Sequence, residues 1–361
     1  MASGLDWVFG MATIVVGLAV LSVVPFLNFF SLGYLLEASG RVATTGRFRD
    51  GFVGVRKASS LGSLVIGIGL VLLPVLFFAG MWNDASLVDP GGAVAARWKV
   101  VLVVSTLMVF GHIIWACLRG GRLRHFLWPA PVRLFRALRQ PNPAALLEIG
   151  NGAGDWVASL RLPHYFWLGF RGFVAAVMWL AIPVGVLILA AQIRIIGIAA
   201  VVNFLGIGLL MIVVLYLPFL QAHFARTDRF EAMFEVRRVR DFFRRAPVAF
   251  WFALLITLLF SLPLYLLKIE LTPREVAWLP ALLFVAFIFP ARLLVGWAMS
   301  RAVRHEADRH WVFRWLGRLA AVPVVIAYVI FVWATQYLSW HGSLSLLEQH
   351  AFLVPAPLMG L

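Results

Sequence analysis

Long runs of apolar residues constrain this chain more than any other feature of its sequence. A helix needs about 20 mostly apolar residues to cross the hydrocarbon core of a bilayer. The runs are continuous, whereas membrane strands would show short segments of alternating hydrophobicity, so helices are predicted. The expected spans are residues 8–35, 61–82, 99–118, 164–191, 195–221, 247–268, 276–300 and 319–340.

The composition agrees with this count. Hydrophobic residues make up 62% of the 361 and charged residues 13%, too few charges for the surface of a water-soluble protein of this size. The sequence therefore predicts an all-α integral membrane protein with about eight transmembrane helices. The first seven residues carry one acid and no basic residue, unlike a cleaved signal peptide, so the first span is expected to be retained.

Basic residues are distributed unevenly among the connections. Net charge is +15, and 24 of the 31 Lys and Arg residues fall between spans one and two, three and four, five and six, and seven and eight. Cytoplasmic loops carry an excess of Lys and Arg, which places these four connections in the cytoplasm and both termini outside, in the cell membrane. Acids interrupt these short clusters, which argues against nucleic acid as a partner.

An internal repeat relates two parts of the chain. Residues 45–56 align without gaps to residues 227–238, and Trp115 and Arg119 match Trp297 and Arg301 at the same offset. The alternative is chance similarity among common residue types. Duplication predicts two parallel four-span halves, residues 1–191 and 192–361, the first with a long basic loop at 119–163.

Each repeated segment carries two phenylalanines and an arginine at i, i+4 and i+8. This spacing predicts a cytoplasmic amphipathic helix lying flat, with its aromatic rings among lipid headgroups and its arginine towards anionic lipid. The alternative is an ordinary hairpin packed on its own bundle. The candidate lipid-contacting residues are Phe48, Phe52 and Arg56, and Phe230, Phe234 and Arg238.

Two arginines lie inside predicted spans and are candidate functional residues, because charge at membrane depth is costly. Arg171 sits about two turns from its cytoplasmic end, so snorkelling is the simpler account. Arg292 lies deeper and follows Pro290, where a broken helix can line a cavity. No Asp or Glu lies well inside a predicted span, which argues against a proton-driven carrier.

The sequence contains no recognisable catalytic, cofactor or metal site. The glycines at 150–154 lack the flanking strand and the Lys-Ser/Thr ending of a phosphate loop. The stretch from His305 to His310 lacks the spacing of a zinc helix. We therefore expect no cofactor, no metal and no enzymatic activity.

The run from Pro25 to Glu37, followed by Arg41, Gly46 and Arg47, resembles the opening of a domain-of-unknown-function family of bacterial and archaeal polytopic membrane proteins. The similarity covers residues 20–80, with weaker echoes in 215–300. The resemblance implies a polytopic topology and supplies no catalytic residue.

These observations favour a non-enzymatic membrane protein that organises lipid or scaffolds a complex. The alternative is a transporter or permease for a small anionic or lipidic substrate, with Arg171 and Arg292 facing it. An intramembrane lipid enzyme would need a polar cluster at membrane depth, and the sequence shows none. The expected partners are the bilayer, anionic lipids at its cytoplasmic face, and a membrane-protein partner or a second copy of the chain.

Overall fold

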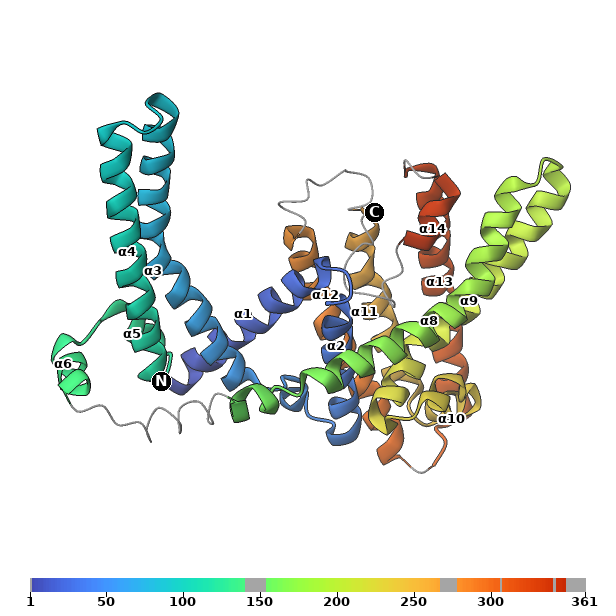
Figure 1. Ribbon diagram of the computed structural model, residues 1–361. Coiled ribbons are helices and arrows are strands. Elements are labelled where there is room, and N and C mark those ends of the chain that lie inside the picture. The colour runs from blue at the N-terminus through green and yellow to red at the C-terminus, as the bar shows by residue number, and fades with distance from the viewer. Residues whose placement is uncertain (1, 140–153, 267–277, 306, 340–341, 349–361) are drawn as a thin grey trace. The chain divides into compact units, whose positions relative to one another are not determined.

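The computed structural model describes residues 2–139, 154–266, 278–305, 307–339 and 342–348, and every regular element in these ranges is a helix (Figure 1). The chain divides into two compact units, Met1–Ile14 with Gly54–Leu160, and Val15–Val53 with Arg161–Leu361. Helix α1 (Ala2–Val23) contributes to both. The boundaries of these units differ from those of the two predicted halves, residues 1–191 and 192–361. The duplication of these halves stays a prediction.

The first unit is built on a helical hairpin. Helices α3 (Val55–Val88) and α4 (Ala93–Leu118) are joined by a tight turn in which Gly91 adopts a left-handed φ of 87°. The short helix α5 (Leu123–Leu127) packs on α3, and α6 (Pro131–Arg139) follows it. The outer faces of α3 and α4 are rich in exposed large apolar side chains, as expected of helices surrounded by lipid.

The second unit contains the larger helical bundle. Its main helices are α2 (Asn28–Thr45), α8 (Leu162–Gln192), α9 (Ile196–Thr227), α11 (Pro247–Leu266), α12 (Trp278–Arg304) and α13 (Trp311–Ala334). Its shorter elements are η1 (Phe48–Gly51), η2 (Phe230–Phe234), α10 (Val236–Arg245), η5 (Thr335–Tyr337), η6 (Gly342–Leu344) and α14 (Ser345–Glu348).

Helix α2 lies inside this bundle, packed against α8, α9 and α12. Twelve of its 18 residues are buried. Glycines allow the close approach: a Cβ on Gly33 would collide with the Tyr165 carbonyl of α8, and one on Gly40 with the backbone of α9 at Ala225. Small residues at helix crossings commonly provide such close packing in membranes.

The predicted first span, residues 8–35, is wrong as a single helix. Helix α1 ends at Val23 and α2 begins at Asn28. Between them Pro25 lacks a backbone N–H, and Phe26 adopts a left-handed φ of 64°, so the helix cannot continue through the connection. The apolar character of residues 24–27 conceals this break in a hydropathy profile.

Seven helices in the described part of the chain are long and apolar enough to cross a membrane. They begin near residues 4, 55, 93, 154, 196, 278 and 311. The pair α10 and α11, which bends by 113°, makes eight if it is counted as one span. The chain is thus an all-helical multi-pass membrane protein, as predicted. Most helices extend beyond the predicted spans, because the polar residues flanking each apolar run are also compatible with helix.

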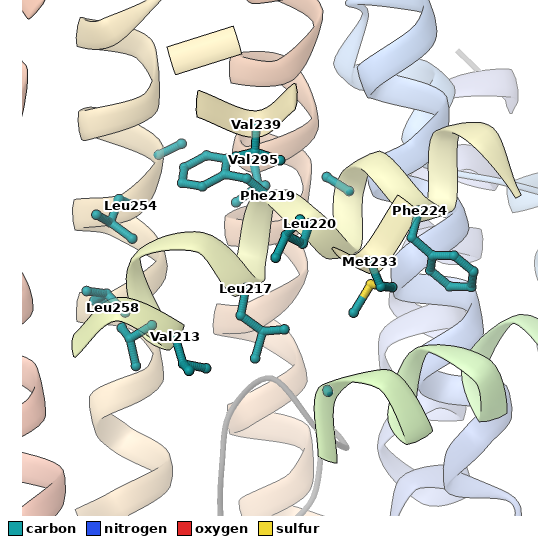
Figure 2. Close-up of a cluster of buried hydrophobic side chains, with 14 of the residues drawn as sticks. Val213, Leu217, Phe219, Leu220, Phe224, Met233, Val239, Leu254, Leu258 and Val295 are labelled. Atoms are coloured by element: carbon teal, nitrogen blue, oxygen red, sulfur yellow. The ribbon is translucent and has the colours of Figure 1, made fainter. Parts of the chain in front are cut away.

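The core of the second unit lies where α9, α11 and α12 meet η2 and α10. Leu217, Leu220 and Phe224 of α9 are fully buried, and Met233 of η2 joins the same cluster (Figure 2). Val239 projects into this core from α10. Burial of these side chains fixes the short elements η2 and α10 against the ends of the long helices.

Candidate functional site

The two repeated segments adopt the same local backbone. Helix α2 ends at Thr45 and α9 at Thr227, and each is followed by a left-handed residue, Gly46 or Asp228. The next residue is extended in both copies, and a 3-10 helix follows it. The likeness is confined to these short stretches, so it bears on the local segment and not on the duplication of whole halves.

The aromatic and basic pair found at the same offset also recurs. The Arg119 guanidinium lies over the Trp115 ring at 5.4 Å, and that of Arg301 over Trp297 at 5.1 Å. Each pair ends a long helix, α4 in the first unit and α12 in the second. A stacked guanidinium keeps N–H donors free for an anion while its position is fixed.

The prediction that each repeated segment forms one continuous amphipathic helix is wrong. In the first copy η1 ends at Gly51, and α3 begins at Val55 after Gly54 adopts a left-handed φ of 70°. In the second, η2 gives way to α10 at Val236. The i, i+4, i+8 spacing therefore does not place the two rings and the arginine on one helical face.

The four predicted aromatic residues pack largely on their own unit. Phe48 stacks on Trp297 with ring centroids 6.3 Å apart, and Phe52 meets Phe289 edge to face at 5.2 Å. Phe230 contacts Phe234, which in turn stacks on Trp179 of α8. Phe48 and Phe234 nevertheless remain 41% and 42% exposed, so each also presents an apolar edge to its surroundings.

The two predicted arginines of the repeat lie on different elements. Arg56 is exposed on the first turn of α3, in the first unit. Arg238 is exposed on α10 and lines a pocket of 340 Å³ with Arg226 and Arg245. Their contact with lipid stays a prediction.

Arg171 forms an ion pair that the sequence does not reveal. Its Nη2 lies 2.5 Å from Oδ1 of Asp228, and its Nη1 donates to the Asp228 carbonyl at 3.2 Å. The guanidinium also lies over the rings of Trp167 and Phe224. A cation here complements the negative C-terminal end of α9. These contacts hold Arg171 against α9.

Arg292 is buried, with a relative exposure of 2%. Its Nη1 donates to Oε1 of Gln221 at 2.5 Å, while its Nε finds no acceptor among the described residues. In the described residues no carboxylate forms an ion pair with it. The structure thus joins Arg292 to α9, as it does Arg171, but by way of a neutral amide.

The basic connections of the second unit gather at one end of its bundle. Arg304, at the end of α12, donates to the Thr45 carbonyl at the end of α2. The backbone N–H of Arg309 donates to the Arg244 carbonyl of α10 at 3.1 Å. The ends of α2, α10 and α12 and the start of α13 are therefore neighbours.

Helix α10 is the strongest concentration of charge at this end. Its ten residues include five arginines, of which Arg237, Arg238 and Arg240 are exposed. Val239 and Phe242 are buried on its opposite face. The sequence pattern indicates this amphipathic helix, since apolar residues recur at 236, 239, 242 and 243 with arginines between them.

A pocket of 410 Å³ lies beside α10, between it and the neighbouring ends of α11, α12 and α13. Its lining includes the arginines Arg245, Arg301 and Arg309 and the aromatic residues Trp251 and Phe252. The residues that line it include no Asp or Glu. Cationic groups beside aromatic walls suit an anion that carries an apolar part.

Two carboxylates near this end each form contacts with one histidine and one arginine. Glu37 of α2 bonds Arg41 at 2.7 Å and His164 at 3.2 Å. Glu235 bonds His223 and Arg229, both at 2.8 Å. The hydrogen bond from His223 and the charge of Arg229 hold the pKa of the Glu235 carboxyl below its usual value.

The described residues contain no group of three or more His, Cys, Asp or Glu side chains that could hold a metal ion. Of the stretch from His305 to His310, Glu306 lies outside the described residues. So does the loop at 140–153, with most of the glycine cluster at 150–154.

Fold and site together define a multi-pass helical membrane protein with an arginine-rich end. Residues 160–271 match the family described as protein of unknown function (DUF4013). This match confirms the predicted resemblance to an uncharacterised family, but over α8 to α11 and not over residues 20–80 that suggested it. No curated protein and no solved structure matches the chain.

Proposed function

We propose that this protein is a non-enzymatic component of the cell membrane that gathers anionic lipids at its arginine-rich face. The observation that carries the proposal is the geometry of α10. This helix meets α11, the apolar member of the pair, at a bend of 113°. With α11 along the bilayer normal, α10 lies close to the membrane plane.

The two faces of α10 suit that position. Its buried face, with Val239 and Phe242, anchors it to the bundle. Its exposed face presents arginines and one acid, Asp241, whose 3.5 Å pairing with Arg244 is solvent-exposed and weak. Each Lys or Arg close to an anionic membrane surface contributes about 1 kcal/mol of attraction.

Neighbouring elements extend this charge. Arg226 of α9 and Arg301 of α12 line pockets that α10 also borders, as does Arg309. A surface of this kind attracts several lipid headgroups at once, and the attraction should weaken as salt rises. The predicted cytoplasmic orientation of the basic connections would place it against the more anionic leaflet.

The transporter alternative depends on Arg171 and Arg292 sharing an anionic substrate. Arg171 is paired with Asp228, and Arg292 is bonded to Gln221. Neither arginine lines the pockets of 340 and 410 Å³ described above. No observation favours transport, so lipid organisation is the function proposed.

The test is lipid enrichment around the purified protein. The protein is reconstituted into mixed phosphatidylcholine and phosphatidylglycerol bilayers, extracted in polymer-bounded discs, and its retained lipids are quantified. We expect phosphatidylglycerol to be enriched over the bulk mixture. Substituting Arg237, Arg238 and Arg244 together by Gln should reduce this enrichment.

A charge-matched control uses the predicted opposite face. Substituting Arg97, Lys99 and Arg194 together by Gln removes the same formal charge from exposed positions. It should leave the enrichment unchanged. Equal enrichment in the wild-type protein and the α10 variant, or an equal loss in both variants, would contradict the proposal.

A further inference from the structure

A groove of 570 Å³ lies within the second unit, between α9, α10, α11 and α13. Most of its lining is apolar: Met211, Leu215, Phe219, Val239, Phe250, Leu254 and Val325. Figure 2 labels three of the lining residues, Phe219 of α9, Val239 of α10 and Leu254 of α11, among the buried side chains. Its size lies in the range of pockets that hold small organic molecules.

Charge in the lining is of one sign. Arg240 of α10 and Arg318 of α13 are its charged residues, and no Asp or Glu is among them. Arg318 lies over the rings of Phe243 at 6.0 Å and Trp315 at 5.7 Å, which fixes its guanidinium. Both arginines belong to the arginine-rich end, since α10 and the start of α13 meet there.

Trp251 belongs to this lining and to that of the 410 Å³ pocket. Its Nε1 is buried and has no hydrogen-bond partner among the described residues, although a buried indole N–H usually has one. Tyr216 contributes a second polar group to the lining.

The groove borders the outer apolar surface of the unit. Ile212 of α9 and Val322 of α13 line it and are 53% and 49% exposed. Exposed apolar side chains continue along both helices, with Phe204 and Leu205 on α9 and Leu319 on α13. On a membrane helix such a surface faces acyl chains, so a chain can enter from the side.

We infer that this groove binds one anionic phospholipid, with an acyl chain against the apolar walls and the phosphate between Arg240 and Arg318. The inference rests on the proposed function and names one defined site within it. Two guanidinium groups without a carboxylate select an anionic headgroup over a zwitterionic one. The long apolar wall selects a lipid over a free phosphate.

Gly208 offers a way to fill the groove without changing charge. It lines the groove, and a Cβ built on it meets nothing within 4 Å. Gly208→Trp should therefore occupy the space of an acyl chain. Gly185 of α8 also has nothing within 4 Å of a built Cβ and does not line the groove, so Gly185→Trp is the matched control.

The experiment is native mass spectrometry of the full chain after reconstitution with phosphatidylglycerol and detergent extraction. We expect one retained phosphatidylglycerol on the wild-type protein and on Gly185→Trp. Gly208→Trp should retain it at roughly tenfold lower occupancy, as should Arg240→Gln combined with Arg318→Gln. Phosphatidylcholine supplied alone should be retained far less.

The outcomes separate the inference from the proposed function. The wild-type protein could enrich phosphatidylglycerol while Gly208→Trp still retains one tightly bound lipid. That result would overturn the groove as the binding site and leave the proposed function standing. Equal retention of phosphatidylcholine would overturn the role of the two arginines. Absence of any enrichment by the wild-type protein would overturn the proposed function as well. Arg314 lies on α13 like Arg318 but is paired with Asp308 and does not line the groove, so Arg314→Gln should retain the lipid.

Discussion

The Arg292 guanidinium and the Gln221 amide form a buried pair, with Nη1 donating to Oε1 at 2.5 Å. Both side chains are almost completely buried, at 2% and 0% relative exposure. The pair links α12 to α9 in the interior of the second unit. None of the described carboxylates forms an ion pair with Arg292. The Gln221 amide oxygen is therefore the acceptor that stabilises this buried charge.

This relationship predicts an asymmetry between the two partners. Gln221→Leu leaves a buried charge without its acceptor and should lower the free energy of unfolding by about 3 kcal/mol or more. Arg292→Met removes the charge itself and should be within about 1.5 kcal/mol of wild type, or more stable. Tryptophan fluorescence during thermal unfolding in detergent measures both.

The double variant completes the cycle. Arg292→Met combined with Gln221→Leu should recover most of the stability that Gln221→Leu loses, because no buried charge remains. Losses that simply add in the double variant would show that the two side chains do not interact.

The sequence predicted the membrane class and the approximate spans because lipid demands long apolar runs, which are local. It did not predict the break at Pro25 and Phe26, since both residues are apolar and α2 is buried by contacts with distant helices. The partners of Arg171 and Arg292 are 57 and 71 residues away along the chain. Such pairings depend on tertiary packing, which no local pattern encodes.

The candidate site shows the same division. The arginines of α10 are visible in the sequence, yet their position depends on the bend to α11. The predicted helix through residues 48–56 was wrong because Gly54 adopts a left-handed conformation. The groove is lined by four helices, and its lining could not be assembled from one stretch of chain.

Close helix packing predicts that Gly33 tolerates no side chain. A Cβ there would meet the Tyr165 carbonyl, and Gly169 of α8 faces Phe29 in the same way. Gly33→Ala should lower the free energy of unfolding by roughly 2 kcal/mol, because the backbones must separate. Gly17→Ala has open space and should stabilise helix α1 by about 0.5 kcal/mol. Thermal unfolding measures both variants. Equal shifts of the midpoint in Gly33→Ala and Gly17→Ala would argue against backbone contact between α2 and α8.

Acid should destabilise the protein partly through Glu235. The pKa of its carboxyl is lower in the folded protein than in the unfolded chain, where it is about 4.3. At pH values above about 4.3 its bonds to His223 and Arg229 therefore stabilise the fold. That contribution is lost as the pH falls through the lower folded value. Glu235→Gln should show a flatter stability profile below about pH 4.3, measured by thermal unfolding across a pH series. Glu231→Gln, at an exposed position of η2, should keep the wild-type profile.

The pairing of Arg171 with Asp228 predicts a graded response. Asp228 holds a left-handed φ of 54° and is 57% exposed. Asp228→Asn keeps both the tolerance for that conformation and an acceptor oxygen, so it should cost at most about 1 kcal/mol.

Arg171→Leu should cost about 1–2 kcal/mol more than Asp228→Asn, since it also removes the bond to the Asp228 carbonyl and the stacking on Trp167 and Phe224. Arg171→Lys keeps the charge but loses the planar guanidinium, so it should fall between the two. Unfolding in detergent ranks the three variants. Equal losses for Arg171→Leu and Asp228→Asn would mean that Arg171 stabilises the fold through its charge alone, and that its carbonyl and ring contacts contribute nothing measurable.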